Sequence, residues 1–290
     1  MEGIQHFPGK SLRLGRLINP LSGRTFVVPL DHSLADGPIA SAPALRDIAR
    51  AVSRNGGDAL LVHKGRMRFL PTDVLRGTAL VIHLNGITRH APDANAKVRL
   101  AEVEEALELG ADAVSIHVNM GSDTEAEQLG DLARAAEGCT RWGLPLIAMV
   151  YPRGPRMGDP TDPELVAHAA NLAADLGADI AKVPYTGSPT TMAEVVRSCP
   201  IGIITAGGAP VGDRQLTRTV GEVVASGALG VAMGRNVWSS PDVAATVRLV
   251  ADALHLPTAD RTALPAPAGA HDPAQPERAL AAPHPVPART

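Results

Sequence analysis

Short runs of valine, isoleucine, leucine and alanine recur along the chain, and segments with apolar residues at helical spacing separate most of them. Runs of this kind are typical of strands that are buried on both faces of a parallel sheet. We predict eight strands, at residues 25–32, 59–65, 79–85, 112–119, 145–154, 179–187, 202–208 and 230–236. The clearest helices between them are predicted at 96–111, 162–178 and 191–199.

The alternation of strands with helices indicates a parallel α/β sheet. Eight consecutive strand–helix units are the repeat of the (β/α)8 TIM barrel. We therefore expect an α/β fold with a single TIM barrel at residues 25–258, and a short N-terminal lead-in at 1–24 that packs on it. An open doubly wound sheet is the alternative, but no G-x-G-x-x-G motif follows the first predicted strand, which disfavours a dinucleotide-binding sheet.

The composition changes near the end of the chain. Over residues 259–290 proline and alanine dominate, large apolar residues are scarce and no periodicity is visible. A segment of this kind cannot bury a core, so we predict a disordered C-terminal tail.

Composition and charge exclude several classes of protein. The formal net charge of −3 offers no basic surface for nucleic acid or for an anionic membrane. The first residues lack the apolar core of a signal peptide, and no apolar run reaches the length of a membrane span, so we expect a cytoplasmic protein. Cys139 and Cys199 do not form a C-x-x-C pair, so neither a disulfide framework nor a thiolate zinc site is predicted. The expected partners are small-molecule substrates and further copies of the same chain, as in a homo-oligomer.

Polar side chains gather at the carboxyl ends of the predicted strands, where a TIM barrel places its active site. They are Asp31, His32, His63, Lys64, His83, Asn85, His117, Asn119, Tyr151, Arg153, Lys182 and Tyr185. The histidines could hold zinc in a metal-dependent enzyme, but no H-x-H or H-E-x-x-H spacing supports this, and we expect no metal site. The predicted substrate-binding residues are His32, Lys64, His83, His117 and Arg153.

Glycines end the last two predicted strands. In TIM barrels the loops after the seventh and eighth strands often bind phosphate through backbone N–H groups. Gly207 and Gly208 lie in the first of these loops, and Gly234 and Arg235 lie in the second. Ordinary turn glycines would explain either loop alone. Because both adjacent loops carry them and Arg235 adds a positive charge, we predict that these four residues bind phosphate.

Lysine is rare in this chain and occurs only as Lys10, Lys64, Lys97 and Lys182. Lys182 stands inside the apolar run "DIAKVP", where a charged amine is costly to bury. One interpretation is an internal salt bridge, for example with Asp31. The other is a nucleophilic amine that forms a Schiff base with a ketone, since burial and a nearby cation such as Lys64 or Arg153 favour the uncharged amine that this reaction needs. From the residues alone both interpretations stay open.

Several motifs, taken in order, resemble those of a known family. They are "GRTFVVPLDHSLADGP", "LLVHKG", "VIHLN", "ADAVSIHVNMGSDTEAE", "GLPLIAMVYPRGP", "ADIAKVPYTG", "ITAGGAP" and "GVAMGRNVW". From about Gly9 to Leu256 the chain resembles the archaeal-type class I aldolases, the group of DhnA-type fructose-bisphosphate aldolases and 2-amino-3,7-dideoxy-D-threo-hept-6-ulosonate synthases. The resemblance implies a Schiff-base aldolase that requires neither a metal nor another cofactor, because the iminium acts as the electron sink.

The resemblance also implies roles for individual residues. Lys182 would be the Schiff-base lysine, Tyr151 the general acid/base, and Asp31 would assist proton transfer. The glycine loops at 207–208 and 234–235 match the phosphate site of the family.

Two departures from the fructose-bisphosphate aldolases bear on the substrate. Ser33 replaces a glycine of that group, and Met149 stands two residues before the implied catalytic tyrosine, where those enzymes tend to have tryptophan. The segments "SIHVNMGSDTEAE" and "HKG" look like the heptulosonate synthases instead. The chain also resembles a bacterial branch of that group, which joins dihydroxyacetone phosphate to L-aspartate 4-semialdehyde. The product, 2-amino-4,5-dihydroxy-6-oxo-7-(phosphonooxy)heptanoate, leads to 3-amino-4-hydroxybenzoate, and we expect this reaction.

Four alternatives remain. The chain could be a 2-amino-3,7-dideoxy-D-threo-hept-6-ulosonate synthase that takes a deoxy-ketohexose phosphate donor, or a class I fructose-bisphosphate aldolase. It could also be a metal-dependent aldolase that uses the histidines, or a non-catalytic phospho-sugar-binding barrel. Lys182 together with both candidate proton-transfer groups argues against the last of these.

Overall fold

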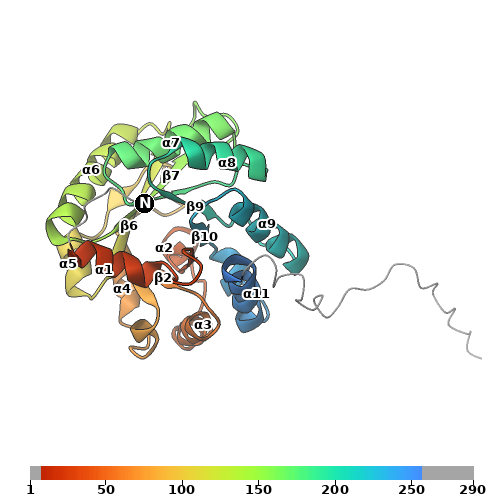
Figure 1. The fold of residues 1–290 in the computed structure, drawn as a ribbon. Helices are drawn as coiled ribbons and strands as arrows, with labels where there is room; N and C mark the ends of the chain where they lie inside the picture. The colour runs from red at the N-terminus through yellow and green to blue at the C-terminus, as the bar shows by residue number, and fades with distance from the viewer. Residues whose placement is uncertain (1–7, 257–290) are drawn as a thin grey trace, which may run out of the picture.

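A computed structural model describes residues 8–256, which form a closed barrel of eight parallel strands in the order β1-β10-β9-β8-β7-β6-β3-β2. The strands are β1 (Thr25–Pro29), β2 (Ala59–His63), β3 (Ala79–His83), β6 (Ala113–Met120), β7 (Leu146–Pro152), β8 (Ile180–Val183), β9 (Gly202–Ala206) and β10 (Gly230–Ala232). Helices surround them (Figure 1). The predicted TIM barrel is confirmed, whereas the tail predicted at 259–290 lies outside the described residues.

Several outer helices begin at a residue whose side chain caps them. Ser41, Asp162, Ser188 and Asp242 each accept a backbone N–H of the first turn. The longer helices are α1 (Pro8–Leu17), α3 (Ala42–Arg54), α6 (Glu125–Trp142), α7 (Pro163–Asp175), α8 (Pro189–Ser198), α9 (Asp213–Ala225) and α11 (Val243–His255). The shorter ones are α2 (His32–Asp36), α4 (Lys64–Met67), η1 (Val74–Arg76), α5 (Val103–Glu108) and α10 (Arg235–Trp238). Helices α7 and α8 confirm the helices predicted at 162–178 and 191–199, with slightly shifted ends.

Side chains alternate along each strand between the barrel interior and the layer of helices. The interior is filled by a cluster of buried apolar residues that includes Val27, Ala59, Leu61, Ala79, Val81, Ile147, Met149, Ile180 and Ile204. Two residues further along, on the same interior face, come His63 after Leu61, His83 after Val81 and Lys182 after Ile180. The apolar interior therefore continues directly into polar side chains at the carboxyl ends of the strands.

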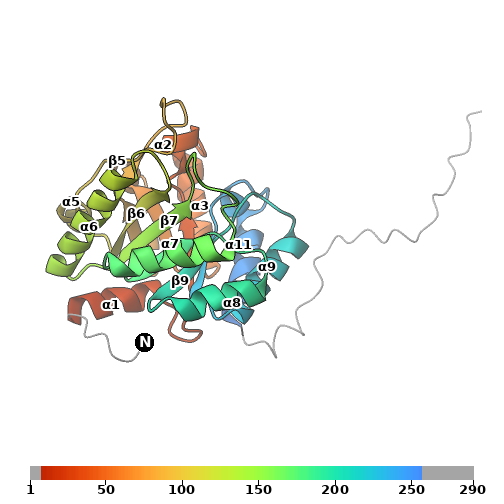
Figure 2. The same cartoon turned by 90° about the horizontal axis from the view of Figure 1, so that it is seen from above.

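Helix α1 lies across the barrel at the end opposite α2 and strand β5 (Val98–Arg99) (Figure 2). Leu17 is fully buried in the interior cluster, and Leu14 and Ile18 pack against that cluster. Lys10 forms a buried ion pair with Asp179, with 3.0 Å between Nζ and Oδ2. The described part of the predicted lead-in thus closes the N-terminal end of the barrel.

Three aspartates repeat one arrangement at this end. Asp58, Asp112 and Asp179 directly precede strands β2, β6 and β8. Their carboxylates accept backbone N–H groups of the neighbouring strands, from Phe26 at 2.6 Å, Leu80 at 2.9 Å and Leu146 at 2.8 Å. The pattern satisfies donors within the first two residues of β1, β3 and β7, where an unpaired buried N–H would be costly.

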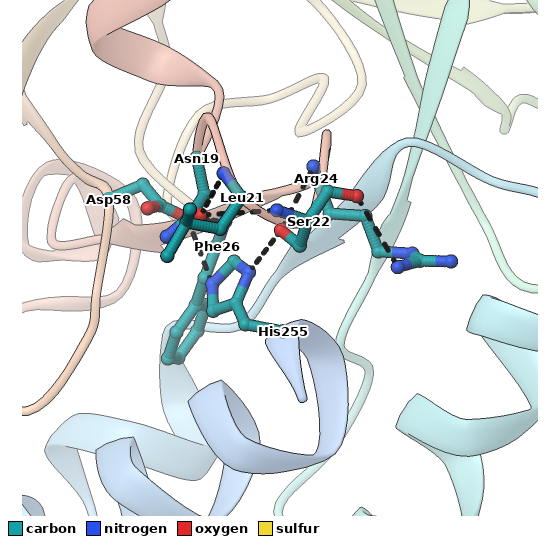
Figure 3. Close-up of polar contacts among 7 residues, drawn as sticks. All are labelled: Asn19, Leu21, Ser22, Arg24, Phe26, Asp58 and His255. Carbon is teal, nitrogen blue, oxygen red and sulfur yellow. Dashed lines mark hydrogen bonds and ion pairs between the residues drawn. The ribbon is translucent and has the colours of Figure 1, made fainter. Parts of the chain in front are cut away.

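Each of these carboxylates also faces a basic side chain. Asp112 and Asp179 pair with Arg16 and Lys10 of α1. Figure 3 shows the third case, in which His255 at the end of α11 places Nε2 3.2 Å from Oδ2 of Asp58 and Nδ1 2.8 Å from Oγ of Ser22. These contacts join the first strands to α1 and α11, and they lie at the end of the barrel that stabilises the fold rather than at the catalytic end.

The helix predicted at 96–111 is wrong in its first part. Residues 98–99 form β5, which pairs antiparallel with β4 (Asn85–Gly86), and helix α5 begins only at Val103. The backbone N–H groups of Leu100 and Ala101 donate to the carbonyl of Leu84 at 2.7 and 3.0 Å. Tertiary hydrogen bonds to the segment after β3 therefore override the helical spacing of this stretch.

Candidate active site

A cavity of about 720 Å³ opens at the carboxyl ends of the barrel strands. It brings together Lys182, Tyr151 and Asp31, which were predicted to be catalytic. The other predicted site residues that line it are His32, His83, His117, Arg153, Gly207, Gly208 and Arg235. Lys64 and Gly234 do not line it.

Lys182 lies on the floor of this cavity. Its side chain projects from β8 on the interior face and is only 7% exposed. Its Nζ lies 3.7 Å from Sδ of Met149, a weak acceptor that carries no charge. Within residues 8–256 no carboxylate lies at ion-pair distance from this amine, so the internal salt bridge with Asp31 is not formed.

Asp31 lies between β1 and α2, with Oδ1 3.2 Å from Nδ1 of His32. Burial by itself would raise the pKa of Asp31. The contact with His32 and the nearby charges of His83, His32 and Lys182 outweigh burial and hold the pKa of this carboxyl well below its usual range. Asp31 is therefore a carboxylate throughout the neutral pH range.

His83 and His63 end neighbouring strands and face each other, with ring centroids 5.2 Å apart. Burial lowers the pKa of His83 to about 3, against the opposing effect of Asp31. Burial also lowers the pKa of His63. Nδ1 of His83 lies 2.8 Å from Oγ of Ser115, which orients the ring. Both imidazoles are neutral near pH 7 and can hydrogen-bond a substrate without adding positive charge.

Tyr151 follows Met149 on the interior face of β7, beside the strand that carries Lys182. The ring of His117 lies edge-on to it at 4.9 Å, and the guanidinium of Arg153 lies 5.6 Å from its centroid. Burial, followed by the charges of Lys97, His83 and Arg153, lowers the pKa of His117 well below its usual range. Tyr151 is thus held between a neutral ring and a cation.

The chain has a second tyrosine, Tyr185, which also lines the cavity. Its hydroxyl donates to Oε2 of Glu222 at 3.0 Å. Burial and this hydrogen bond raise the pKa of Tyr185, so its hydroxyl gives up a proton less readily than a free phenol. Tyr151 is the tyrosine whose hydroxyl is not engaged by a carboxylate in the described structure.

The two glycine loops are joined by Asn236. Its Nδ2 donates to the carbonyls of Gly207 and Ala209 at 2.9 and 3.2 Å, and its Oδ1 accepts the N–H of Val211. The N–H of Gly207 already donates to the carbonyl of Ala232. Close packing requires glycine at position 207, because a Cβ there would lie 2.7 Å from Cγ of Met233.

Gly208 has the positive φ of 67° that favours glycine. A Cβ on Gly234 would lie 2.6 Å from the carbonyl oxygen of Pro29, so close packing requires this glycine as well. Gly208 and Arg235 both line the cavity. Within residues 8–256 neither donates its backbone N–H to a barrel strand, in contrast to Gly207.

Residues 25–240 match the model of the DeoC/LacD family of aldolases. The chain belongs to this family. It is 45% identical over 262 residues to 2-amino-4,5-dihydroxy-6-oxo-7-(phosphonooxy)heptanoate synthase of Streptomyces griseus, covering 90% of this aldolase and 95% of that synthase. It is 41% identical over 250 residues to 2-amino-3,7-dideoxy-D-threo-hept-6-ulosonate synthase 1 of Archaeoglobus fulgidus, covering 86% and 90% of the two chains.

Solved structures agree with this assignment. An archaeal fructose 1,6-bisphosphate aldolase superposes with a TM-score of 0.77 at 29% identity, covering 85% of this chain and 99% of the other. A Schiff-base-forming fructose-1,6-bisphosphate aldolase, studied through its reaction intermediates, superposes with a TM-score of 0.78 at 30% identity, covering 84% and 99%. The resemblance to class I aldolases is confirmed, and the protein is an aldolase that makes or breaks carbon–carbon bonds.

In this aldolase Lys64 lies outside the cavity. It begins α4, is exposed, and places Nζ 2.9 Å from a carboxylate oxygen of Glu105. The preceding residue, His63, faces the interior, and successive side chains at a strand end point to opposite sides. The predicted role of Lys64 in substrate binding is not supported by this position.

Sequence reasoning missed Lys97, which lines the cavity. It was assigned to a helix that begins only at Val103. The available signal was the scarcity of lysine in the sequence. It applies to Lys97 as well as to Lys182, and each of the four lysines has a defined contact in the structure. Asn95 also lines the cavity and was not among the predicted site residues.

Among the residues that the structure describes, no group of three or more His, Cys, Asp or Glu side chains converges closely enough to hold a metal ion. None of the described helices is long and apolar enough to cross a membrane.

Proposed function

We propose that this aldolase joins dihydroxyacetone phosphate to L-aspartate 4-semialdehyde through a Schiff base on Lys182, giving 2-amino-4,5-dihydroxy-6-oxo-7-(phosphonooxy)heptanoate. The observation that carries the proposal is the amine of Lys182, buried on the cavity floor and, in the described part of the chain, without a carboxylate partner. The choice of substrates is supported by the 45% identity to the Streptomyces griseus synthase over 90% of this chain.

The reaction begins when the unprotonated amine of Lys182 attacks the C2 carbonyl of dihydroxyacetone phosphate. Loss of water leaves an iminium. Tyr151 removes a proton from C3, and the electrons of that C–H bond move into the iminium to give an enamine. The enamine carbon attacks the aldehyde, and the new alkoxide takes the proton back from Tyr151. Water then adds to the iminium and releases the seven-carbon ketone and free Lys182.

Asp31 stays ionised throughout this cycle, because its pKa lies well below its usual range. Its charge interacts with that of Lys182, so the carboxylate stabilises the positive iminium at the stage where that charge develops. His83, whose pKa is about 3, and His117 remain neutral and are available to bind substrate hydroxyl groups. Arg235 and Gly208 bind the phosphate of the donor.

Borohydride trapping tests the nucleophile. Reduction in the presence of dihydroxyacetone phosphate should leave an adduct on the peptide that contains Lys182 and none on the peptide that contains Lys64. Lys182→Arg should lower kcat by roughly 10³-fold or more and abolish trapping, because the guanidinium keeps the charge but cannot form the Schiff base. Near-normal turnover in Lys182→Arg, or an adduct on another lysine, would contradict the proposal.

A second candidate has direct support from the 41% identical Archaeoglobus fulgidus relative, whose name describes a 2-amino-3,7-dideoxy-D-threo-hept-6-ulosonate synthase. Both candidates use the same lysine and differ in the donor. Product analysis with L-aspartate 4-semialdehyde and either dihydroxyacetone phosphate or a deoxy-ketohexose phosphate separates them. The cytoplasmic location and the homo-oligomeric state stay predictions, and light scattering after size exclusion measures the second.

A further inference from the structure

Lys97 and Arg153 place two positive charges on one side of the cavity. Lys10 and Lys64 have carboxylate partners elsewhere in the fold. Within residues 8–256, neither Lys97 nor Arg153 has a carboxylate at ion-pair distance. The lysines without such a partner in that range are thus Lys97 and Lys182, and both line the cavity.

The order of strands places Lys97 and Arg153 away from the phosphate loops. Lys97 lies in the segment that joins β3 to β6. Arg153 follows β7 at its border with β6, where its backbone N–H donates to the carbonyl of Met120 at the end of β6. In the ring of eight strands, β3 and β6 lie opposite β9 and β10, which carry the loops with Gly208 and Arg235. Strands β7 and β8, with Tyr151 and Lys182, lie between these two sides. The cavity therefore has a positive region on each side of the Schiff-base lysine.

The segment that carries Lys97 is anchored. The carbonyl of Asn95 accepts Nδ2 of Asn119 at 2.8 Å and Nε2 of Gln128 at 3.0 Å. Nζ of Lys97 donates to the carbonyls of Ala96 at 3.0 Å and Ala94 at 3.3 Å. An ammonium has three donors, so one remains for a ligand.

The surroundings of Lys97 disfavour the charged form of its amine. Burial, followed by the charge of Arg153, lowers the pKa of Lys97 to about 8, although Asp93 opposes the shift. An anion bound between Lys97 and Arg153 would favour the charged amine and relieve this repulsion. The pair therefore favours an anionic group of the second substrate, because the phosphate of the first binds across the cavity.

The geometry points to Lys97, together with Arg153, as the site that binds the α-carboxylate of the acceptor aldehyde and so selects an amino-acid semialdehyde. This inference rests on the proposed function. The seven-carbon product carries a phosphate at one end and a carboxylate at the other, which matches the two positive regions. An amino-acid carboxylate is favoured over a second phosphate by the similarity to the two aminoheptulosonate synthases.

The test compares L-aspartate 4-semialdehyde with its methyl ester, in which a neutral ester group replaces the negatively charged carboxylate. Wild-type enzyme should show a lower KM for the acid than for the ester. Lys97→Met should raise the KM for the acid by about 10- to 100-fold, the value of a hydrogen bond between charged groups. The KM values for the ester and for dihydroxyacetone phosphate should change less than about threefold. Arg156→Met is the matched control, because Arg156 is exposed, pairs with Asp123 and does not line the cavity.

Lys97→Arg keeps a positive charge and provides the second variant. It should retain the preference for the acid over the ester. In the wild type the KM for the acid should rise as the pH passes about 8, where Lys97 loses its proton. In Lys97→Arg this rise should disappear over the same range. The other charged or titratable groups facing Lys97 are Asp93, Arg153 and His117, all of which remain in both enzymes.

Several results would overturn the inference. They are equal losses for acid and ester in Lys97→Met, an unchanged preference for the acid, a selective loss for dihydroxyacetone phosphate, and a selective loss for glyceraldehyde 3-phosphate as acceptor. Failure of the wild type to form a borohydride adduct with dihydroxyacetone phosphate would instead refute the proposed function. If the wild type forms the adduct on Lys182 and Lys97→Met keeps the wild-type preference for the acid, the role of Lys97 is refuted and the proposed function stands.

Discussion

The nucleophile of this aldolase is defined by what surrounds it at the scale of single residues. Lys182 is flanked on its strand by Ala181 and Val183, which face the helices and are fully buried. In the described part of the chain its polar contact is the thioether of Met149. A thioether neither neutralises the amine nor anchors it strongly, so Lys182 remains available to a ketone.

The buried histidines should make the fold sensitive to acid. The pKa of His83 is about 3 in the folded chain and 6.5 in the unfolded chain, so between these values the unfolded chain binds the extra proton. The free energy of unfolding should therefore fall as the pH falls below about 6.5. Urea unfolding at pH 7 and pH 4.5 measures how much free energy of unfolding is lost on acidification. This loss should be smaller by about 2–3 kcal/mol in His83→Gln than in wild type.

The control for this prediction is His168→Gln, which replaces an exposed histidine on α7. Its pH-dependent loss should equal that of the wild type. His63 and His117, whose pKa values are also lowered by burial, are present in both variants and still contribute, so only the difference between variants is diagnostic. Identical losses in wild type and His83→Gln would show that His83 is not held neutral by the fold.

At the scale of elements, the loops after β9 and β10 act as one unit because Asn236 holds them together. Arg235 begins α10 and lines the cavity beside Gly208. Arg235→Gln should raise the KM for dihydroxyacetone phosphate by about tenfold or more, since a charge-assisted contact to phosphate is lost. The KM for the acceptor should change little. Arg214→Gln, an exposed change on α9, is the control, and equal effects on both substrates would place the phosphate elsewhere.

The aspartates at the N-terminal end of the barrel should matter for stability and little for catalysis. Asp112 accepts the N–H of Leu80 and pairs with Arg16, with 2.6 Å between Oδ1 and Nε. Asp112→Ala leaves that N–H without its acceptor, so the free energy of unfolding should fall by about 1–3 kcal/mol, measured by urea denaturation at pH 7.

Asp47→Ala on α3 is the comparison for Asp112, because Asp47 is exposed and pairs with Arg50 only at 3.8 Å. Its effect should stay within about 0.5 kcal/mol. The kcat of folded Asp112→Ala should match wild type. A loss of turnover without a loss of stability would contradict the division of the barrel into a stabilising and a catalytic end.

At the scale of the whole molecule, the barrel separates stability from chemistry along its axis. Helix α1 lies at the N-terminal end of the barrel (Figure 2), and the three aspartates precede strands at the same end. The cavity lies at the carboxyl ends of the strands. Both ends are joined by one interior layer of apolar side chains. This arrangement lets loops at the catalytic end vary in sequence without removing the contacts that close the barrel.

The described barrel ends with α11 at His255, whose ring contacts Ser22 and Asp58. A chain that stops after residue 258 keeps all of these contacts. Its midpoint of thermal unfolding should equal that of the full chain, and its turnover should stay within about twofold, because the removed segment has no periodic apolar face to bury. A large loss of either would show that residues 259–290 contribute to the site or to an interface.

The sequence by itself determined the eight strands, their alternation with helices and the polar residues at the strand ends, because apolar runs and helical spacing are local properties of the chain. It also singled out Lys182, since an amine inside an apolar run is chemically conspicuous. Only the tertiary structure decided that Lys64 faces a surface glutamate and Lys97 faces the cavity. It also decided that residues 98–99 pair with β4 rather than belong to a helix. The backbone N–H of Gly207 likewise donates to the carbonyl of Ala232 in the barrel, which the sequence did not indicate. These outcomes depend on strand register and on the closure of the ring, which bring together residues far apart in the chain and which no local pattern encodes.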